Sequence, residues 1–548
     1  MTQSHRLVPN PVRCPDVLMI GNGERQTLAP SPLLWHGSVI GRLGRDVYRR
    51  KLARFLSHSE DETVIALIAS ITATLAGNEA ARRAVPDLPP EALGAELGSP
   101  WHIPPWTLET LINELLAIPK MRSPRNGRIR TLHATRFSIL RVVARSLVKL
   151  ENAEDGIFLD RHDVFYEMAR IAQRQYPWQR GAINAPSLYR AMVLYGSGTA
   201  SEHFEAEAGL AVSDFVKMGF YLSGAFTNNE FVRRTRDLSQ LKISRGMRDA
   251  ALAKFAIAHR EARRRVASMR VGHRHTAYSP SLLRDFPIIA FGPQGERLRA
   301  PLPDLIAHRY TTGLYLDVVD GGPSVWTGIG ERFETYALEY LQAMMSPYGL
   351  SGEREYGSKK ARYRTPDILV LDAHGIVAVI ECKAKRMSFD ARYADDPLHA
   401  SAAGFDELAK GVFQLWRFFA HARRGLFDER HVAPDCQGIL MTADGWLALA
   451  SRQAESVIAA AHALADKVGD IEAEDRRKIA FAPIEDVEYA LQHGTGESFL
   501  EACRAIVSDE KRGFQLSVAH RSPLDEPRNY PFVDRLETML PWLRDDGR

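Results

Sequence analysis

Two apolar segments joined by a three-residue loop are the feature that most constrains how this chain folds. Residues 365–372 and 376–383 are rich in Ile, Val and Leu, and Ala373, His374 and Gly375 connect them. A loop of this length with Gly at its last position is typical of a β-hairpin in which that Gly adopts a left-handed conformation. The pattern therefore predicts two antiparallel strands that pair outward from this loop.

The expected hairpin places charged residues at one end. With His374 at the centre of the loop, Asp367 lies opposite Glu381, to within the one residue that a bulge would shift. Because strand side chains alternate between faces, Glu381 and Lys383 point the same way and Cys382 points the other way. We therefore expect two carboxylates and one ammonium group to meet at the end of an otherwise apolar hairpin.

Converging carboxylates repel each other unless a cation offsets their charge. Mg²⁺ prefers carboxylate oxygens and keeps several waters, which leaves room for a phosphate oxygen, and Mn²⁺ is expected to substitute for it. Held by Asp367 and Glu381, the ion would polarise a phosphodiester and generate a nucleophile, while Lys383 positions the attacking water or offsets developing charge. The residue types indicate metal-assisted hydrolysis. The alternative is a surface hairpin whose end charges are only solvated.

The Pro before Asp367 and the spacing Glu381-x-Lys383 at the end of an apolar strand resemble the motif of the PD-(D/E)XK, or restriction-endonuclease-like, nuclease superfamily. This resemblance covers residues 328–449. It implies that Asp367 and Glu381 bind the metal and that Lys383 assists the attacking water. It says nothing about the part of the chain that precedes it.

The resemblance also implies a further acidic metal ligand in a helix before the hairpin. Glu334, which opens a helix expected over residues 334–345, is the match we choose. Glu331 and Glu339 are the rival candidates. A Glu at a helix start also stabilises the helix dipole without any catalytic role.

A helix after the hairpin carries one more candidate catalytic residue. Relatives that act on DNA ends or single strands have a Gln there, followed four residues later by an aromatic side chain. Gln414 matches the first position, and Phe418 stands where Tyr is commoner. A polar residue on an amphipathic helix is also ordinary, so the structural interpretation of Gln414 stays open.

The spacing of apolar residues changes between residues 280 and 303, where several prolines interrupt the helical pattern. Apolar residues recur at helical spacing before this stretch, and strand-like and helical segments alternate after it. We expect a multidomain protein: an all-α N-terminal region and a C-terminal α/β restriction-endonuclease-like domain with a central mixed sheet flanked by helices. The expected parts are an irregular N-terminal arm (1–33), a helical recognition or regulatory region (34–279), a junction (280–327), the nuclease domain (328–500) and a C-terminal extension (501–548).

Two groups of basic residues are candidates for nucleic-acid binding. Thirteen Lys or Arg between residues 233 and 274 stand against three acidic residues, and clustered cations gain from the release of counterions condensed on phosphates. A solvated helix face or surface is the alternative for both groups. The candidates are Arg263, Arg264 and Arg265 in the first group, and Lys359, Lys360, Arg362, Arg364 and Lys385 close to the hairpin in the second.

Composition narrows the class of protein only slightly. The 71 Lys and Arg against 67 Asp and Glu give a net charge of +4, which is too small to argue for a polyanionic partner. The four cysteines are far apart and form no C-x-x-C pair, as expected in a reducing cytoplasm. The N-terminal segment lacks the apolar core of a signal peptide, and the longest apolar run, 64–77, is too short to span a bilayer. We therefore expect a cytoplasmic protein with no membrane partner.

The expected function is hydrolysis of DNA phosphodiester bonds, in a restriction-like or anti-phage defence setting. The preference for DNA and the defence role come from the resemblance alone. One alternative is a toxin nuclease that cleaves RNA or tRNA. Others are a non-catalytic nucleic-acid-binding scaffold that keeps the fold, and a nuclease that is latent until a partner arrives. The helical region would supply recognition, a contact with a protein partner, or homo-oligomerisation.

Overall fold

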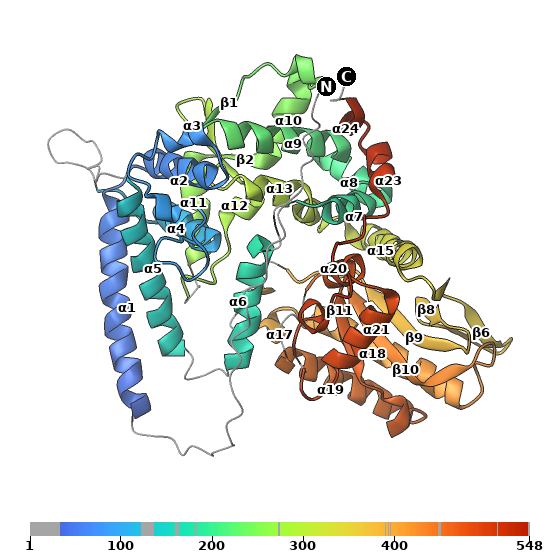
Figure 1. Cartoon of the computed structure of the whole chain (residues 1–548). Coiled ribbons are helices and arrows are strands. Elements are labelled where there is room, and N and C mark those ends of the chain that lie inside the picture. Colours follow the sequence, from blue (N-terminus) through green and yellow to red (C-terminus); the bar gives the residue numbers. More distant parts are fainter. Residues whose placement is uncertain are drawn as a thin grey trace.

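The computed structural model describes residues 33–545, except 122–135, 159–163, 180, 182, 272–274, 389–390, 393, 395, 446, 448–450 and 512. The irregular arm expected over residues 1–33 thus lies outside the described residues, apart from Leu33. Figure 1 shows a helical N-terminal half beside a C-terminal half built around a sheet.

The N-terminal half is mainly helical, as expected. In α2 and α4 the apolar residues fall at helical spacing, and Ile65, Ile68, Leu111 and Leu115 are all fully buried in one core. The elements of this half are α1 (Leu33–Ser57), α2 (Asp61–Leu75), α3 (Glu79–Arg82), η1 (Pro90–Ala92), α4 (Pro105–Ala117), α5 (Phe137–Phe158), α6 (Val164–Gln179), α7 (Ala185–Tyr195), α8 (Gly198–Ala208), α9 (Val212–Asn228), η2 (Ser239–Leu241), α10 (Arg245–Phe255) and α11 (His259–Arg270).

The expectation of an all-α region over residues 34–279 needs a correction. Strands β1 (Val232–Arg233) and β2 (Ala256–Ala258) lie in it and join β3 (Ile288–Phe291) and β4 (Arg297–Arg299) in a sheet of order β1-β4-β3-β2. Each of the two is only two or three residues long, so it has no alternating pattern that a sequence could reveal. Both form because a later part of the chain supplies the pairing partner.

The C-terminal half contains a five-stranded mixed sheet of order β11-β10-β9-β8-β5. The pairs β5–β8 and β8–β9 are antiparallel, whereas β9–β10 and β10–β11 are parallel. Its strands are β5 (Gly349–Gly352), β8 (Ile368–Leu371), β9 (Ile376–Lys383), β10 (Val432–Thr442) and β11 (Ile479–Pro483).

Helices cover both faces of this sheet because strand side chains alternate. Val370 and Ile380 face a core shared with α15 (Gly322–Met344), α20 (Ile484–Gln492) and α21 (Gly496–Ile506). Leu369 and Val379 face the opposite core, shared with α18 (Ala402–Arg423) and α19 (Ser451–Val468). The α/β class and the mixed sheet flanked by helices are thus confirmed.

Shorter elements connect these layers. They are α12 (Leu282–Asp285), α13 (Asp304–Tyr310), η3 (Thr312–Leu314), α14 (Tyr315–Val318), the paired strands β6 (Glu355–Ser358) and β7 (Ala361–Arg364), α17 (Pro397–Ala400), η4 (Ala473–Asp475), α22 (Leu516–Ala519), α23 (Val533–Met539) and α24 (Trp542–Asp545).

One hydrophobic core extends from Leu188 in α7 to Leu540 near the C-terminus and includes one face of the five-stranded sheet. Helices α7 to α10 therefore pack in the same core as the sheet. The domain limits drawn from the sequence stay predictions. Within the part of the chain that the structure describes, no helix is both long and apolar enough to cross a membrane.

Candidate active site

The hairpin of β8 and β9 has the expected register. Ile368 pairs with Ile380 and Leu369 with Val379, and a bulge follows before Leu371. Extending this register by one residue beyond β8 brings Asp367 opposite Glu381. The two carboxylates therefore belong to the same end of the sheet.

Gly375 in the hairpin loop differs from expectation. Its φ of +153° is positive but far from the left-handed helical region. A Cβ at this position would lie 2.3 Å from the backbone oxygen of His431, which accepts a hydrogen bond from the N–H of Ile376. Both this positive φ, which L side chains rarely adopt, and the close approach of the chain entering β10 require a glycine here.

Asp367 is held by the backbone of β9. Its Oδ2 accepts a hydrogen bond of 2.6 Å from the N–H of Cys382. The Asp367 side chain is half-buried, and burial raises the pKa of its carboxyl group. This carboxylate is thus fixed beside the last residues of β9.

Glu381, Lys383 and Gln414 form the centre of the site. The Lys383 ammonium donates to Glu381 Oε1 at 2.8 Å and to Gln414 Oε1 at 3.1 Å. Glu381 is only 2% exposed. Cys382 faces the core that contains α15, on the other side of the sheet from α18, as the alternation predicts. The structure therefore brings together the charged pair from β9 and the Gln from α18.

The aromatic residue expected to accompany Gln414 does not reach the site. Phe418 is buried, and its ring lies 5.0 Å from that of Phe427 and 6.3 Å from that of Tyr356, measured between centroids. It stabilises the core under α18. Gln414 therefore belongs to the charged cluster, whereas Phe418 does not.

Gly411 is a residue of the site that the sequence analysis missed. A Cβ there would lie 2.5 Å from Leu440 Cδ1 and 3.0 Å from Lys383 Cε. The missing side chain lets α18 lie directly on β9 and β10, and Gln414 follows three residues later in the same helix. A Gly within an amphipathic helix was the available signal, since Gly weakens a helix and often has a packing reason.

Glu334 lies in a different part of its helix from the one expected. The helix α15 begins at Gly322, so Glu334 is near its middle and cannot act on the helix dipole at the first turn. Burial, and next the charge of Asp367, raise the pKa of Glu334 to about 7. Of its rivals, Glu331 is exposed and Glu339 pairs with Arg535. Of these three acidic residues of α15, Glu334 is the one whose charge acts on Glu381.

The charges at this end of the sheet do not balance. Burial, and next the charge of Asp367, raise the pKa of Glu381 to about 8. Burial lowers the pKa of Lys383, but Glu381 outweighs it and raises that pKa above its ordinary value. Three carboxyl groups share one ammonium group, so a further cation would be stabilised here.

The donor set fits a magnesium ion held by few protein ligands. Among the described residues, no three His, Cys, Asp or Glu side chains are close enough together to hold a metal ion by themselves. Mg²⁺ is usually bound through one or two carboxylates and completed by water. Asp367 and Glu381 supply that number of hard oxygen ligands, and the charge of Glu334 acts on Glu381.

The basic residues near the hairpin have varied positions. The turn between β6 and β7 carries Lys359 and Lys360 at the end of this small hairpin farther from Asp367, and both are exposed. Arg362 pairs with Glu355 at 3.2 Å, Arg364 pairs with Glu353 at 3.1 Å, and Lys385 is exposed beyond β9.

The structure does not bring Arg263, Arg264 and Arg265 to the hairpin. Their helix α11 lies in the N-terminal half, on the opposite side of the molecule from β8 and β9 (Figure 1). Arg263 donates to Asp61 Oδ2 at 2.8 Å and to the Ile118 oxygen at 2.7 Å, which are contacts inside that half. Arg264 and Arg265 both pair with Glu261 of the same helix.

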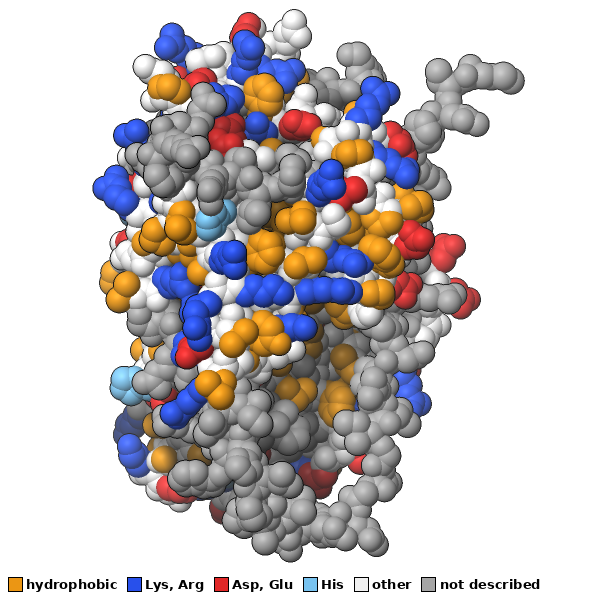
Figure 2. All heavy atoms as spheres, turned by 90° about the vertical axis from the view of Figure 1, so that its left-hand side faces the viewer, with side chains coloured by type: hydrophobic (Ala, Val, Ile, Leu, Met, Phe, Trp, Pro, Cys, Tyr) orange, Lys and Arg blue, Asp and Glu red, His pale blue; other side chains and the backbone are white. Residues whose placement is uncertain are grey.

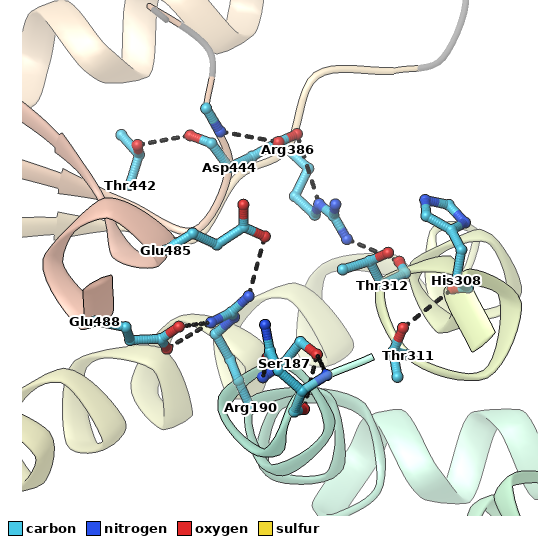
Figure 3. Close-up of polar contacts among 12 residues, drawn as sticks. Ser187, Arg190, His308, Thr311, Thr312, Arg386, Thr442, Asp444, Glu485 and Glu488 are labelled. Atoms are coloured by element: carbon cyan, nitrogen blue, oxygen red, sulfur yellow. Dashed lines mark hydrogen bonds and ion pairs between the residues drawn. The ribbon is translucent and has the colours of Figure 1, made fainter. Parts of the chain in front are cut away.

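Arg386 follows β9 and holds this segment to Thr312 and Asp444. It donates to the Thr312 oxygen at 2.8 Å and lies 3.6 Å from Asp444 Oδ2, which also pairs with Arg392 at 2.5 Å. Figure 3 shows Arg386, Thr312 and Asp444 beside a second polar network, in which Arg190 of α7 contacts Glu485 and Glu488 of α20. The contacts of Arg386 join the segment after β9 to Thr312 and Asp444, and those of Arg190 join α7 to α20.

Comparison with known proteins adds no relative: no protein-family model, no curated protein and no solved structure matches this chain. Geometry and chemistry alone therefore carry the interpretation of the site.

Proposed function

We propose that this protein is a metal-dependent nuclease that hydrolyses DNA phosphodiester bonds, using a restriction-endonuclease-like C-terminal domain. The observation that carries the proposal is the contact of Lys383 with Glu381 and Gln414, beside the Asp367 carboxylate that β9 holds. An acid pair and a lysine gathered at the end of an apolar sheet are costly to folding, which supports a catalytic role over a structural one.

The carboxylates of Asp367 and Glu381 would hold Mg²⁺, with Mn²⁺ as a substitute. When bound, the ion supplies Lewis-acid polarisation of the phosphodiester. The N–H of Cys382 orients Asp367 by binding its Oδ2. Burial keeps water away from Glu381, which strengthens its attraction to any cation nearby.

Lys383 contributes a fixed positive charge and a hydrogen-bond donor. An ammonium group has three N–H donors, and Glu381 and Gln414 accept two of them. The third is available to orient the attacking water or to stabilise charge that develops on a phosphate oxygen. Gln414 is neutral, so it positions Lys383 without cancelling its charge.

Glu334 would contribute through a water molecule rather than by direct contact, because no three His, Cys, Asp or Glu side chains among the described residues are close enough to hold one ion. It lies in the middle of α15, and the charge of Asp367 acts on it. The preference for DNA and the restriction-like or anti-phage role rest on the resemblance to the superfamily.

Incubation of the full chain with plasmid, linear duplex, single-stranded DNA and RNA tests the proposal, with Mg²⁺, Mn²⁺ or EDTA in parallel. We expect metal-dependent cleavage of DNA that is lost in Lys383→Ala and Asp367→Ala. Lys467→Ala and Asp509→Ala, which replace exposed residues, are the matched controls and should cleave normally. Cleavage of RNA alone would replace the proposal with a toxin nuclease, and no cleavage of any substrate would favour a non-catalytic scaffold.

A further inference from the structure

Helices α1 and α5 lie side by side at one edge of the molecule (Figure 1) and present a shared outer face that is rich in cations. On α1 the exposed cationic residues recur at helical spacing, and a matching stripe runs along α5. We call this surface the α1–α5 face. Its exposed Lys and Arg are Arg42, Arg50, Lys51 and Arg54 on α1, Arg145 and Lys149 on α5, and Arg136 just before α5.

The acidic residues of the two helices do not neutralise this face. Glu151 and Glu154 are buried and point inward, where Arg174 pairs with the first and Arg49 with the second. Among the residues of α1 and α5 whose side chains are described, Asp46 is the one acidic residue classed as exposed, and Asp155 is half-buried. The charge presented to solvent is therefore strongly positive, even though the whole chain is nearly neutral.

Aromatic rings hold some of these cations in place. The Lys149 ammonium lies 5.8 Å from the centre of the Tyr48 ring, which links the stripes of α5 and α1. The guanidinium carbon of Arg141, also on α5, lies 4.0 Å from the centre of the Trp101 ring. Figure 2 shows Lys and Arg side chains gathered across the middle of this side of the molecule, with apolar side chains between them.

We propose that the α1–α5 face binds the phosphate backbone of duplex DNA without reading its sequence. The choice of DNA as the polyanion rests on the proposed nuclease function, whereas the binding surface follows from the charges themselves. Arg42 to Arg54 span about 18 Å along the axis of α1. On one DNA strand, phosphates follow each other every ~3.4 Å along the helix axis, so the stripe is long enough to meet about five of them.

An anionic membrane fits this face less well. A helix that lies in a membrane surface keeps its apolar residues on one side and its cations on the other. Here Leu43 and Val47, 63% and 54% exposed, share one stripe of α1 with Arg50 and Arg54. The apolar side of α1 is already buried against α5, since a Cβ at Gly44 would touch Ala153. No separate apolar side is left for lipid among the described residues of this helix pair.

The α1–α5 face is far from the β8–β9 hairpin in Figure 1. It would therefore hold DNA away from the bond that is cut and raise the local concentration of substrate. This role differs from that of the basic residues beside the hairpin, which would act close to the metal.

The test compares two triple variants of the full chain with equal changes in charge. Arg50→Glu, Lys51→Glu and Arg54→Glu together reverse part of the face. Arg430→Glu, Lys467→Glu and Arg521→Glu reverse three exposed cations of the C-terminal half and serve as the matched control. The readout is fluorescence anisotropy of a short labelled DNA duplex in EDTA, which prevents cleavage, at several salt concentrations.

We expect the first triple variant to bind at least about tenfold more weakly, and its affinity to depend less steeply on salt, because fewer counterions are released. The control variant should bind like the parent, and circular dichroism should show that both are folded. A milder triple change to Ala should give an intermediate loss. Vesicles of phosphatidylcholine and phosphatidylserine in equal parts should not bind the parent protein.

Three results would overturn the inference: unchanged DNA binding by the first triple variant, an equal loss in the control, or no DNA binding by the parent. Vesicle binding that the first triple variant abolishes, with DNA binding intact, would assign the face to a membrane instead. The outcome is separate from that of the nuclease proposal. DNA binding through this face without any cleavage would sustain the inference and refute the nuclease proposal. Cleavage by the parent, with DNA binding unchanged in the first triple variant, would sustain the nuclease proposal and refute the inference.

Discussion

Lys383 receives its position from two acceptors on different elements, Glu381 on its own strand and Gln414 on α18. A lysine side chain has several rotatable bonds, so a single acceptor would leave its ammonium group mobile. The second acceptor restricts it to one orientation.

Replacing Gln414 with Ala should lower the cleavage rate without unfolding the protein. The variant keeps the charge of Lys383 and removes one of the groups that orient it, and loss of such a supporting contact costs about 10- to 100-fold in activity. Single-turnover cleavage is the measurement. Arg417→Ala, three residues further along α18, is the control, and an equal loss in both variants would show that Gln414 has no specific role.

Replacing the three acidic residues of α15 one at a time tests which of them acts on the site. Glu334→Gln removes a charge that acts on the site and should reduce the cleavage rate by about tenfold. Glu331→Gln should leave it unchanged, because Glu331 is exposed. Glu339→Gln should affect only the surface pair with Arg535. Cleavage rates at saturating Mg²⁺ decide between them, and a loss confined to the Glu331 variant would move the role to that residue.

At the scale of elements, the β8–β9 hairpin could be predicted from sequence because its information is local. Alternation, loop length and the position of Gly375 lie within twenty residues of one another, and the register follows from them. The packing of α18 on β9 could not be predicted, because the need for Gly411 arises from Leu440, a residue of another strand. Strands β1 and β2 could not be predicted either, because the strands that they pair with come later in the chain.

Gly411→Val should separate α18 from the sheet. The new side chain would collide with Leu440 and with the Lys383 side chain, and overpacking of this kind costs about 1 to 3 kcal/mol of unfolding free energy. Chemical denaturation measures the loss, and the cleavage rate should fall as well because Gln414 moves away. Gly330→Ala in α15 is the control: a Cβ there has open space, so stability should hold or rise. A Gly411→Val variant with an unchanged unfolding free energy would contradict the close packing of α18 on the sheet.

At the scale of the whole molecule, buried ion pairs join the end of β9 to the helices that surround it. Asp444, which follows β10, pairs with Arg386 and Arg392, and Arg386 reaches the Thr312 oxygen. The charged end of the sheet thus depends on contacts with segments far away in sequence. Because these pairs are long-range, the sequence predicts the hairpin but not the ion pairs that support it.

Asp444→Asn should destabilise the protein and change how its stability depends on pH. Removing one partner of a buried charge cluster costs about 3 to 5 kcal/mol, because the two Arg side chains are left uncompensated. Although burial raises the pKa of Asp444, Arg392 and Arg386 outweigh it and hold that pKa below its ordinary value. The stabilisation is therefore complete at neutral pH and is lost as the pH falls through the folded-state pKa, below about 4.

Denaturation of the parent and the Asp444→Asn variant at neutral and acidic pH checks this prediction. The gap in unfolding free energy between the two should narrow as the pH falls. A gap that stays constant, or widens, would mean that the carboxylate charge of Asp444 does not stabilise the folded state.

We propose that the charged end of the β8–β9 hairpin cuts DNA with the help of a metal ion. The most direct measurement is the single-turnover cleavage rate of a DNA duplex in Mg²⁺ by the parent protein, Lys383→Ala and Lys467→Ala. Loss of the Lys383 ammonium should reduce the rate by at least about 100-fold, as removal of a charge-stabilising donor does, while the Lys467 variant matches the parent and EDTA stops all three. Equal, metal-dependent cleavage by Lys383→Ala and the parent would contradict the claim.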